Sequence, residues 1–166
     1  MAINPALASI SDLAKNLEAE LHAFQGFIQI LQTEQDSLVE ANVDPLLELA
    51  RLKSEKVLLL SQLADLRTRF ISAQGFPPKQ GSMDAWLKQQ QRNPESSRIA
   101  ELWVQLLTLA ESAQQLNNIN GSMIDARLRN NQQALSILQS AAKQSALYGA
   151  DGHTQSLGLG RPLGKV

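Results

Sequence analysis

The chain has 166 residues, of which 43% are hydrophobic and only 4% aromatic, with no cysteine, two histidines and a formal net charge of −1. Without cysteine there can be no disulfide framework, thiolate zinc site or cysteine nucleophile. The balance of 15 basic and 16 acidic residues gives no electrostatic footprint for nucleic acid, and the length fits one domain, with or without a tail.

The N-terminal region contains no basic stretch followed by an apolar stretch, so it does not read as a secretory signal. The longest apolar run, Val57 to Leu60, is far shorter than the roughly 20 residues of a membrane span. We therefore expect a cytoplasmic protein with no stable membrane insertion.

Apolar residues at helical spacing predict a first long helix over about 6–41 and a second over about 45–74. Asp44-Pro45 is a helix-start signal, and Gly75 followed by two prolines ends the second helix. The expected core positions are Leu17, Leu21, Phe24, Ile28, Leu31 and Leu38, then Leu49, Leu52, Leu59, Leu63, Leu66 and Phe70.

A short helix is predicted over about 82–91, and a third long helix over about 94–148, started by Asn93-Pro94. Its apolar positions keep a seven-residue pattern through Ile99, Leu102, Leu106, Leu109, Ala113 and Leu116. The sequence between Asn117 and Gly121 has the weakest helix propensity in this element, and we expect a kink or fraying there. Residues 149–166 are rich in glycine and predict a flexible tail.

No segment alternates with the period of a half-buried strand, so the fold class is all-α. We expect an antiparallel bundle of three long helices with coiled-coil-like packing over residues 1–148, followed by the tail. At about 1.5 Å per residue the third helix would span roughly 80 Å, against about 50 Å and 45 Å for the others. It must therefore bend, pair with another chain, or present an apolar surface to a partner.

The residues give little sign of chemistry. His22 and His153 are far apart in the sequence, and no Glu-x-x-His occurs. We therefore expect no metal site, no cofactor and no catalytic activity. Acidic side chains such as Glu20 and Glu34 are expected to be solvated, and Arg67 to be solvated or paired with a neighbouring carboxylate.

The apolar surface of the third helix is the candidate binding site. Helical spacing resumes after Gly121, and a tyrosine at the helix end suits an interface because its ring is apolar and its tip polar. An amphipathic partner helix could lie along this surface. The predicted binding residues are Ile124, Leu128, Leu135, Leu138, Ala142, Leu147 and Tyr148.

The same residues carry a family likeness. The chain resembles FlgN-type flagellar export chaperones through an ordered series of helical motifs: LQTEQDSL at 31–38, LLELARLKSEK at 46–56, LNxxNG at 116–121, IxxRL at 124–128, NQQALxxL at 131–138 and LYGxxG at 147–152. Each motif is a low-information pattern, and their order is more specific than any one of them.

The resemblance implies a chaperone of the flagellar type III export system. Its partners would be hook-associated proteins of the hook–filament junction, kept from assembling early, and a component of the export gate. It places client binding on the C-terminal helix, with Tyr148 at the position of a tyrosine implicated in client and gate contacts.

Two alternatives come from other classes. The third helix could instead build an oligomeric coiled-coil adaptor that has no secretion client. A helical-bundle enzyme would need inward-facing carboxylate and histidine ligands, for which the sequence gives no motif. The sequence leaves open whether the protein is a monomer or a homodimer.

Overall fold

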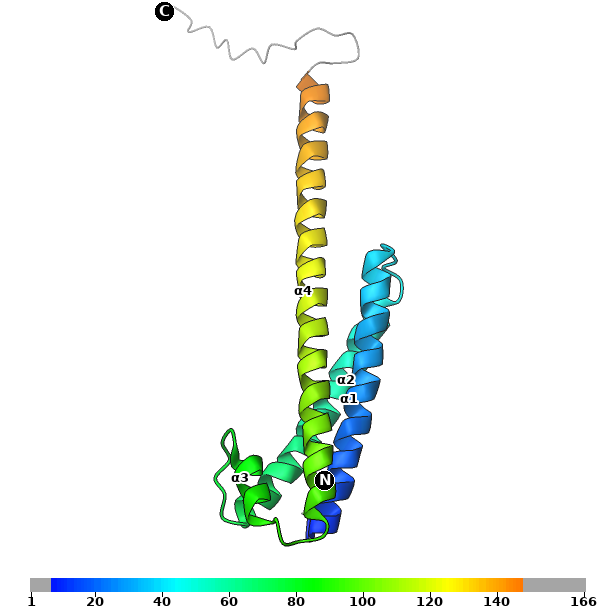
Figure 1. Cartoon of the computed structure of the whole chain (residues 1–166). Coiled ribbons are helices and arrows are strands. Elements are labelled where there is room, and N and C mark those ends of the chain that lie inside the picture. The colour runs from blue at the N-terminus through cyan, green and yellow to red at the C-terminus, as the bar shows by residue number, and fades with distance from the viewer. Residues whose placement is uncertain (1–6, 148–166) are drawn as a thin grey trace, which may run out of the picture. The chain divides into compact units, whose positions relative to one another are not determined.

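The computed structural model describes residues 7–147, excluding the side chains of residues 146 and 147. It contains four helices and, in the described range, no strand: α1 (Ile10–Val39), α2 (Leu46–Ala73), α3 (Ser82–Gln89) and α4 (Ser96–Leu147) (Figure 1). The all-α class is confirmed, and each predicted helix is present within a few residues of its expected bounds. The chain divides into two units, Met1–Met123 and Ile124–Val166.

The start of α1 is fixed by its own side chains. The Ser9 hydroxyl accepts a hydrogen bond from the Asp12 backbone N–H at 3.1 Å, and the Asp12 carboxylate accepts one from the Ser9 hydroxyl at 2.8 Å. Because these bonds use a free N–H of the first turn and put a negative charge at the positive end of the helix, they favour helix initiation at this point.

Both long helices of the hairpin end in the same hydrogen-bonded motif. After α2, the Gly75 N–H donates to Ser72 O and the Phe76 N–H to Ile71 O, with Gly75 at φ +91°. This is the predicted glycine cap. After α1, the equivalent left-handed position is Ala41, at φ +60°. A side chain is disfavoured in that conformation, so the first turn carries backbone strain that the second does not.

The predicted helix starts at the two X-Pro signals were early by a residue or two. The N-cap of α2 is Pro45, which cannot form a side-chain cap, whereas Pro45 was expected to be the first helical residue after an Asp44 cap. At α4, the Asn93 side-chain oxygen accepts a bond from the Glu95 N–H at 3.0 Å, and the helix begins at Ser96.

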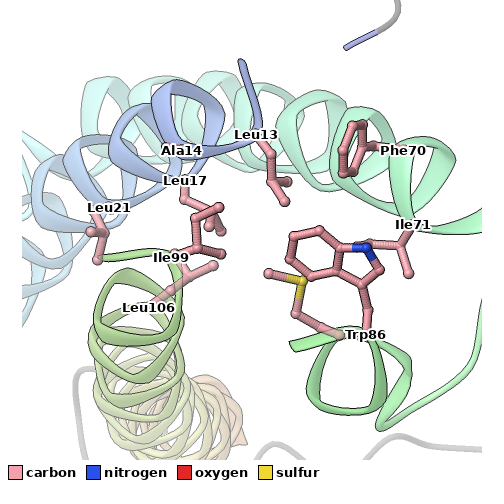
Figure 2. Packing of buried hydrophobic residues seen from close by; sticks show 10 residues of the cluster. Leu13, Ala14, Leu17, Leu21, Phe70, Ile71, Trp86, Ile99 and Leu106 are labelled. Atoms are coloured by element: carbon pink, nitrogen blue, oxygen red, sulfur yellow. The ribbon is translucent and has the colours of Figure 1, made fainter. Parts of the chain in front are cut away.

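The main core of the Met1–Met123 unit draws on all four helices. Leu13 and Leu17 of α1, Phe70 and Ile71 of α2, Trp86 of α3 and Ile99 and Leu106 of α4 point toward one another (Figure 2). The Phe70 and Trp86 rings meet edge to face, with centroids 5.9 Å apart. The predicted stripe of α1 is confirmed: Leu17, Leu21, Leu31 and Leu38 are buried.

The predicted stripe of α2 was wrong at one position. Leu59 is exposed, while Leu60 packs against the smaller cluster formed by Phe27, Leu31 and Ala113. The contact line shifts at Lys56, whose side-chain end lies 3.2 Å from the position that a Cβ would occupy on Gly26. A residue with no side chain on α1 thus admits the long lysine, and the next contact falls four residues later.

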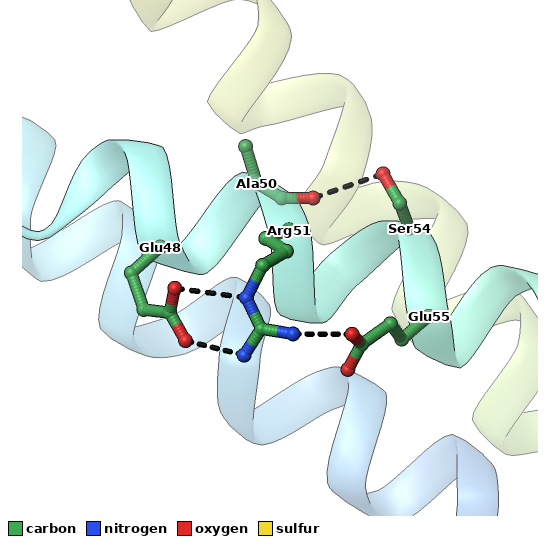
Figure 3. Close-up of polar contacts among 5 residues, drawn as sticks. All are labelled: Glu48, Ala50, Arg51, Ser54 and Glu55. Carbon is green, nitrogen blue, oxygen red and sulfur yellow. Dashed lines mark hydrogen bonds and ion pairs between the residues drawn. The ribbon is translucent and has the colours of Figure 1, made fainter.

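The exposed face at the start of α2 is held by charge pairs along the helix. Arg51 donates to Glu48 through Nε at 2.9 Å and Nη2 at 2.5 Å, and to Glu55 through Nη1 (Figure 3). The two carboxylates raise the pKa of Arg51, and Arg51 lowers that of Glu48. These side chains are exposed, so the pairs add little to stability and belong to a solvated surface.

The expected break in α4 is absent. Helix runs continuously through residues 117–121, and a Cβ added to Gly121 would have no neighbour within 4 Å. Asn120 is fully buried there, and its side-chain hydrogen bonds to α1 offset the weak local helix propensity.

Candidate binding surface on the C-terminal part of α4

The predicted binding residues lie in the part of α4 that belongs to the Ile124–Val166 unit. The side chains of Ile124, Leu128, Leu135 and Leu138 are between 43% and 65% exposed, and Ala142 is exposed as well. Leu147 is the last residue of α4, and its side chain, like the whole of Tyr148 and the predicted tail, lies outside the described residues. Five of the seven predicted residues are therefore open to a partner.

These five residues share one side of the helix. At about 100° per residue, Ile124, Leu128, Leu135, Leu138 and Ala142 fall within an arc of about 80°; we call this set the α4 stripe. Asn131 lies inside the same arc and is its one polar member. Ile137 is 61% exposed but falls on the opposite side, so it lies outside the stripe.

Exposed apolar residues are unremarkable singly, but five on one arc are a different matter. Throughout residues 124–145, only Arg127 is less than fully exposed. Because a helix with an apolar face draws most of its stability from burying that face, the stripe has the character of a surface that acts by binding another molecule.

Sequence reasoning missed a buried polar cluster on three helices of the Met1–Met123 unit. The Asn120 amide of α4 donates to Leu31 O and to the Glu34 carboxylate of α1, both at 2.8 Å. Lys53 of α2 donates to the same carboxylate at 3.0 Å. Glu34 is buried, not solvated as expected. The available signal was Asn120 at the seven-residue step after Ile99, Leu106 and Ala113, where an apolar residue is usual.

A second polar network links all four helices. Glu20 of α1 is buried, again contrary to expectation, and accepts bonds from Asn16 at 2.8 Å and Arg67 at 3.0 Å. The Arg67 guanidinium lies 4.8 Å from the centroid of the Trp103 ring, and the Trp103 Nε1–H donates to Asp84 at 3.0 Å. Arg67 thus has the neighbouring carboxylate that the sequence allowed for.

Burial dominates the electrostatics of Glu20. Desolvation raises the pKa of its carboxyl above the ordinary value, against the opposing effect of the Arg67 charge and the hydrogen bonds from Arg67 and Asn16. A carboxyl with a raised pKa can signal acid–base catalysis, but these bonds tie Glu20 to helix partners on both sides. Its role is structural.

A hollow of about 480 Å³ lies between the end of α2, the start of α3 and α4. Its lining includes Ile71, Met83, Trp103 and Leu107, with Arg67 and Asp84 among its polar residues. Both of those polar groups already have partners in the network through Trp103. The hollow therefore offers no arrangement for catalysis. Within the described residues, no group of three or more His, Cys, Asp or Glu side chains could hold a metal ion.

In the described part of the chain, no helix is both long and apolar enough to cross a membrane. The FlgN protein family matches residues 1–156. The chain belongs to the FlgN family.

Its relatives cover nearly the whole chain. A flagella synthesis protein FlgN from Yersinia enterocolitica is 27% identical over 93% of this chain and 98% of its own length, and one from Proteus mirabilis is 29% identical over the same shares. The Salmonella typhimurium protein of that name is 33% identical over 42% of this chain and 53% of its own. No solved structure matches the chain.

Proposed function

We propose that this protein is a cytoplasmic chaperone of the flagellar export system that binds hook-associated proteins of the hook–filament junction. It prevents their premature assembly and helps to deliver them to a component of the export gate. Family membership over residues 1–156 and the relatives' name, flagella synthesis protein, support a role in flagellar synthesis. The exposed α4 stripe carries the more specific proposal of client binding.

In this proposal the Met1–Met123 unit is a rigid base and the rest of α4 is the binding arm, ending in Leu147 and Tyr148. The three long helices would form the antiparallel bundle predicted from the sequence. Two contacts between α1 and α2 support this: Glu34 pairs with Lys53 near one end, and Glu20 with Arg67 near the other. Such an arrangement keeps binding away from the core that holds the fold.

The mechanism is the covering of an apolar face. A subunit that assembles through an amphipathic segment exposes that segment while it is monomeric, and the α4 stripe would bury it by helix-to-helix packing. Burying roughly 600 Å² of apolar area at about 25 cal/mol per Å² gives a gross gain of about 15 kcal/mol. Lost rigid-body freedom and side-chain ordering reduce this gain to a moderate affinity, which lets the client leave at the gate.

The test is a binding titration with a purified hook-associated protein. The double variant Leu135→Glu/Leu138→Glu places two charges in the stripe, whereas the matched control Gln133→Glu/Gln144→Glu places two on the opposite side of the helix. We expect the first to lose binding at least about a hundredfold, since a buried unpaired charge costs several kcal/mol, and the control to bind normally. Equal binding by both variants would refute the stripe as the client site.

The other use of such a stripe is self-association in an oligomeric adaptor. Light scattering over a range of protein concentrations separates the two uses. An oligomer that persists on dilution and is abolished by Leu135→Glu/Leu138→Glu would favour the adaptor, because its stripe would already be covered.

A further inference from the structure

The segment that carries the α4 stripe differs in charge from the rest of the chain. Residues 124–145 contain three basic side chains, Arg127, Arg129 and Lys143, against one acidic side chain, Asp125, a net charge of +2 in a chain whose net charge is −1. No glutamate occurs after Glu111. The remaining polar residues of the segment are Asn, Gln and Ser, which carry no charge.

Two of the basic residues border the stripe on opposite sides. With Leu135 as the reference, a regular helix places Arg127 about 80° to one side and Lys143 about 80° to the other. Asp125 and Arg129 lie farther round, four residues apart on neighbouring turns, where their charges largely offset one another. A helix that docks on the stripe would therefore meet a positive charge at each edge.

We infer that the occupant of the α4 stripe is a single amphipathic helix of another protein, whose apolar face is bordered by acidic side chains. The inference rests on the proposed function and adds the chemistry of the partner. Flanking pairs of opposite charge select partners and fix register in two-helix packing. A second copy of this chain would bring the same positive edges to the same stripe, and like charges at these positions oppose pairing.

The flanking charges act on selectivity more than on total affinity. Arg127 is half-buried and Lys143 is exposed, and pairs at such positions contribute little each and weaken with salt. Changing both edges of a partner from acidic to basic turns two attractions into two repulsions. We expect about a tenfold difference in affinity at low salt, much of it in the association rate.

The probes are two synthetic helical peptides of about 21 residues, long enough to follow residues 124–145. They share one apolar face of leucines at three- and four-residue spacing, and differ only in glutamate or lysine at the edge positions. Fluorescence anisotropy measures their binding to the full chain at about 0.05 M and about 0.5 M NaCl. The variants are Arg127→Gln/Lys143→Gln and a matched pair of exposed cations elsewhere, Lys79→Gln/Arg92→Gln.

The inference predicts that the glutamate peptide binds about tenfold more tightly, that salt removes most of the difference, and that only Arg127→Gln/Lys143→Gln abolishes it. Equal binding of the two peptides, tighter binding of the lysine peptide, or binding of neither would overturn it. Failure of the proposed function looks different: Leu135→Glu/Leu138→Glu would then leave capture of the hook-associated protein unchanged, whatever the peptides do.

Discussion

The contribution of the Asn120 cluster to stability is open to a direct test by Asn120→Ala. Asn120 is 0% exposed and Glu34 5%, so both lie beyond the reach of compensating water. The substitution removes the bond to the Glu34 carboxylate and the bond to Leu31 O. A hydrogen bond to a charged group is worth about 1.5–3 kcal/mol and one to a neutral carbonyl about 0.5–1.5 kcal/mol.

Two smaller effects oppose this loss. The Asn120 Oδ1 atom is buried and has no hydrogen-bond partner among the described residues, so deleting it relieves about 1–3 kcal/mol of desolvation. Alanine also has the better helix propensity, by about half a kcal/mol. The balance is a net loss of about 1–2 kcal/mol, which lowers Tm by about 3–6 °C in a protein of this size.

The assay is thermal and urea unfolding followed by circular dichroism. The matched control is Asn117→Ala, which makes the same change on an exposed position of the same helix and should be neutral or slightly stabilising. If Asn120→Ala unfolds at the same temperature as Asn117→Ala, the cluster does not hold α4 to α1 as argued.

Three further predictions concern the fold. Gly121→Ala should raise the free energy of unfolding by about 1 kcal/mol, because the added Cβ meets no neighbour and helix propensity improves; an unchanged Tm would contradict this. Ala41→Gly should also stabilise by about 1 kcal/mol by relieving the positive φ, and a lower Tm would show that the strain argument fails. For Glu20, a raised folded-state pKa means that its contribution is fully present below about pH 4.3 and is lost as pH rises through the folded value. The stability of wild type relative to Glu20→Gln, from urea unfolding, should therefore fall from pH 4 upward, and a rise would reverse the sign.

Much of the fold could be predicted from apolar spacing and from the proline and glycine punctuation. Leu17, Leu31 and Phe70 are buried as their spacing indicated, and Gly75 ends α2 as its position indicated. These features depend on contacts within one helix or one turn, which the local sequence encodes. Ala41 was not foreseen as a left-handed cap, because alanine carries no such signal.

The polar interior could not be predicted in the same way. Glu20 and Glu34 resemble any surface glutamate in sequence, and they are buried because Arg67 and Lys53 of another helix meet them. That pairing depends on helix register, which spacing within one helix does not set. The α4 stripe was foreseen because its spacing is local, and its exposure agrees with the excess length of the third helix.

The central claim is that the α4 stripe touches the client. The most direct measurement is photo-crosslinking in motile cells, with a photoreactive amino acid at Leu138 on the stripe or at Gln133 on the opposite side of the helix. The account predicts a crosslink between position 138 and a hook-associated protein, and none from position 133. A crosslink from position 133 alone, or the absence of any hook-associated protein from the position 138 product, would contradict it.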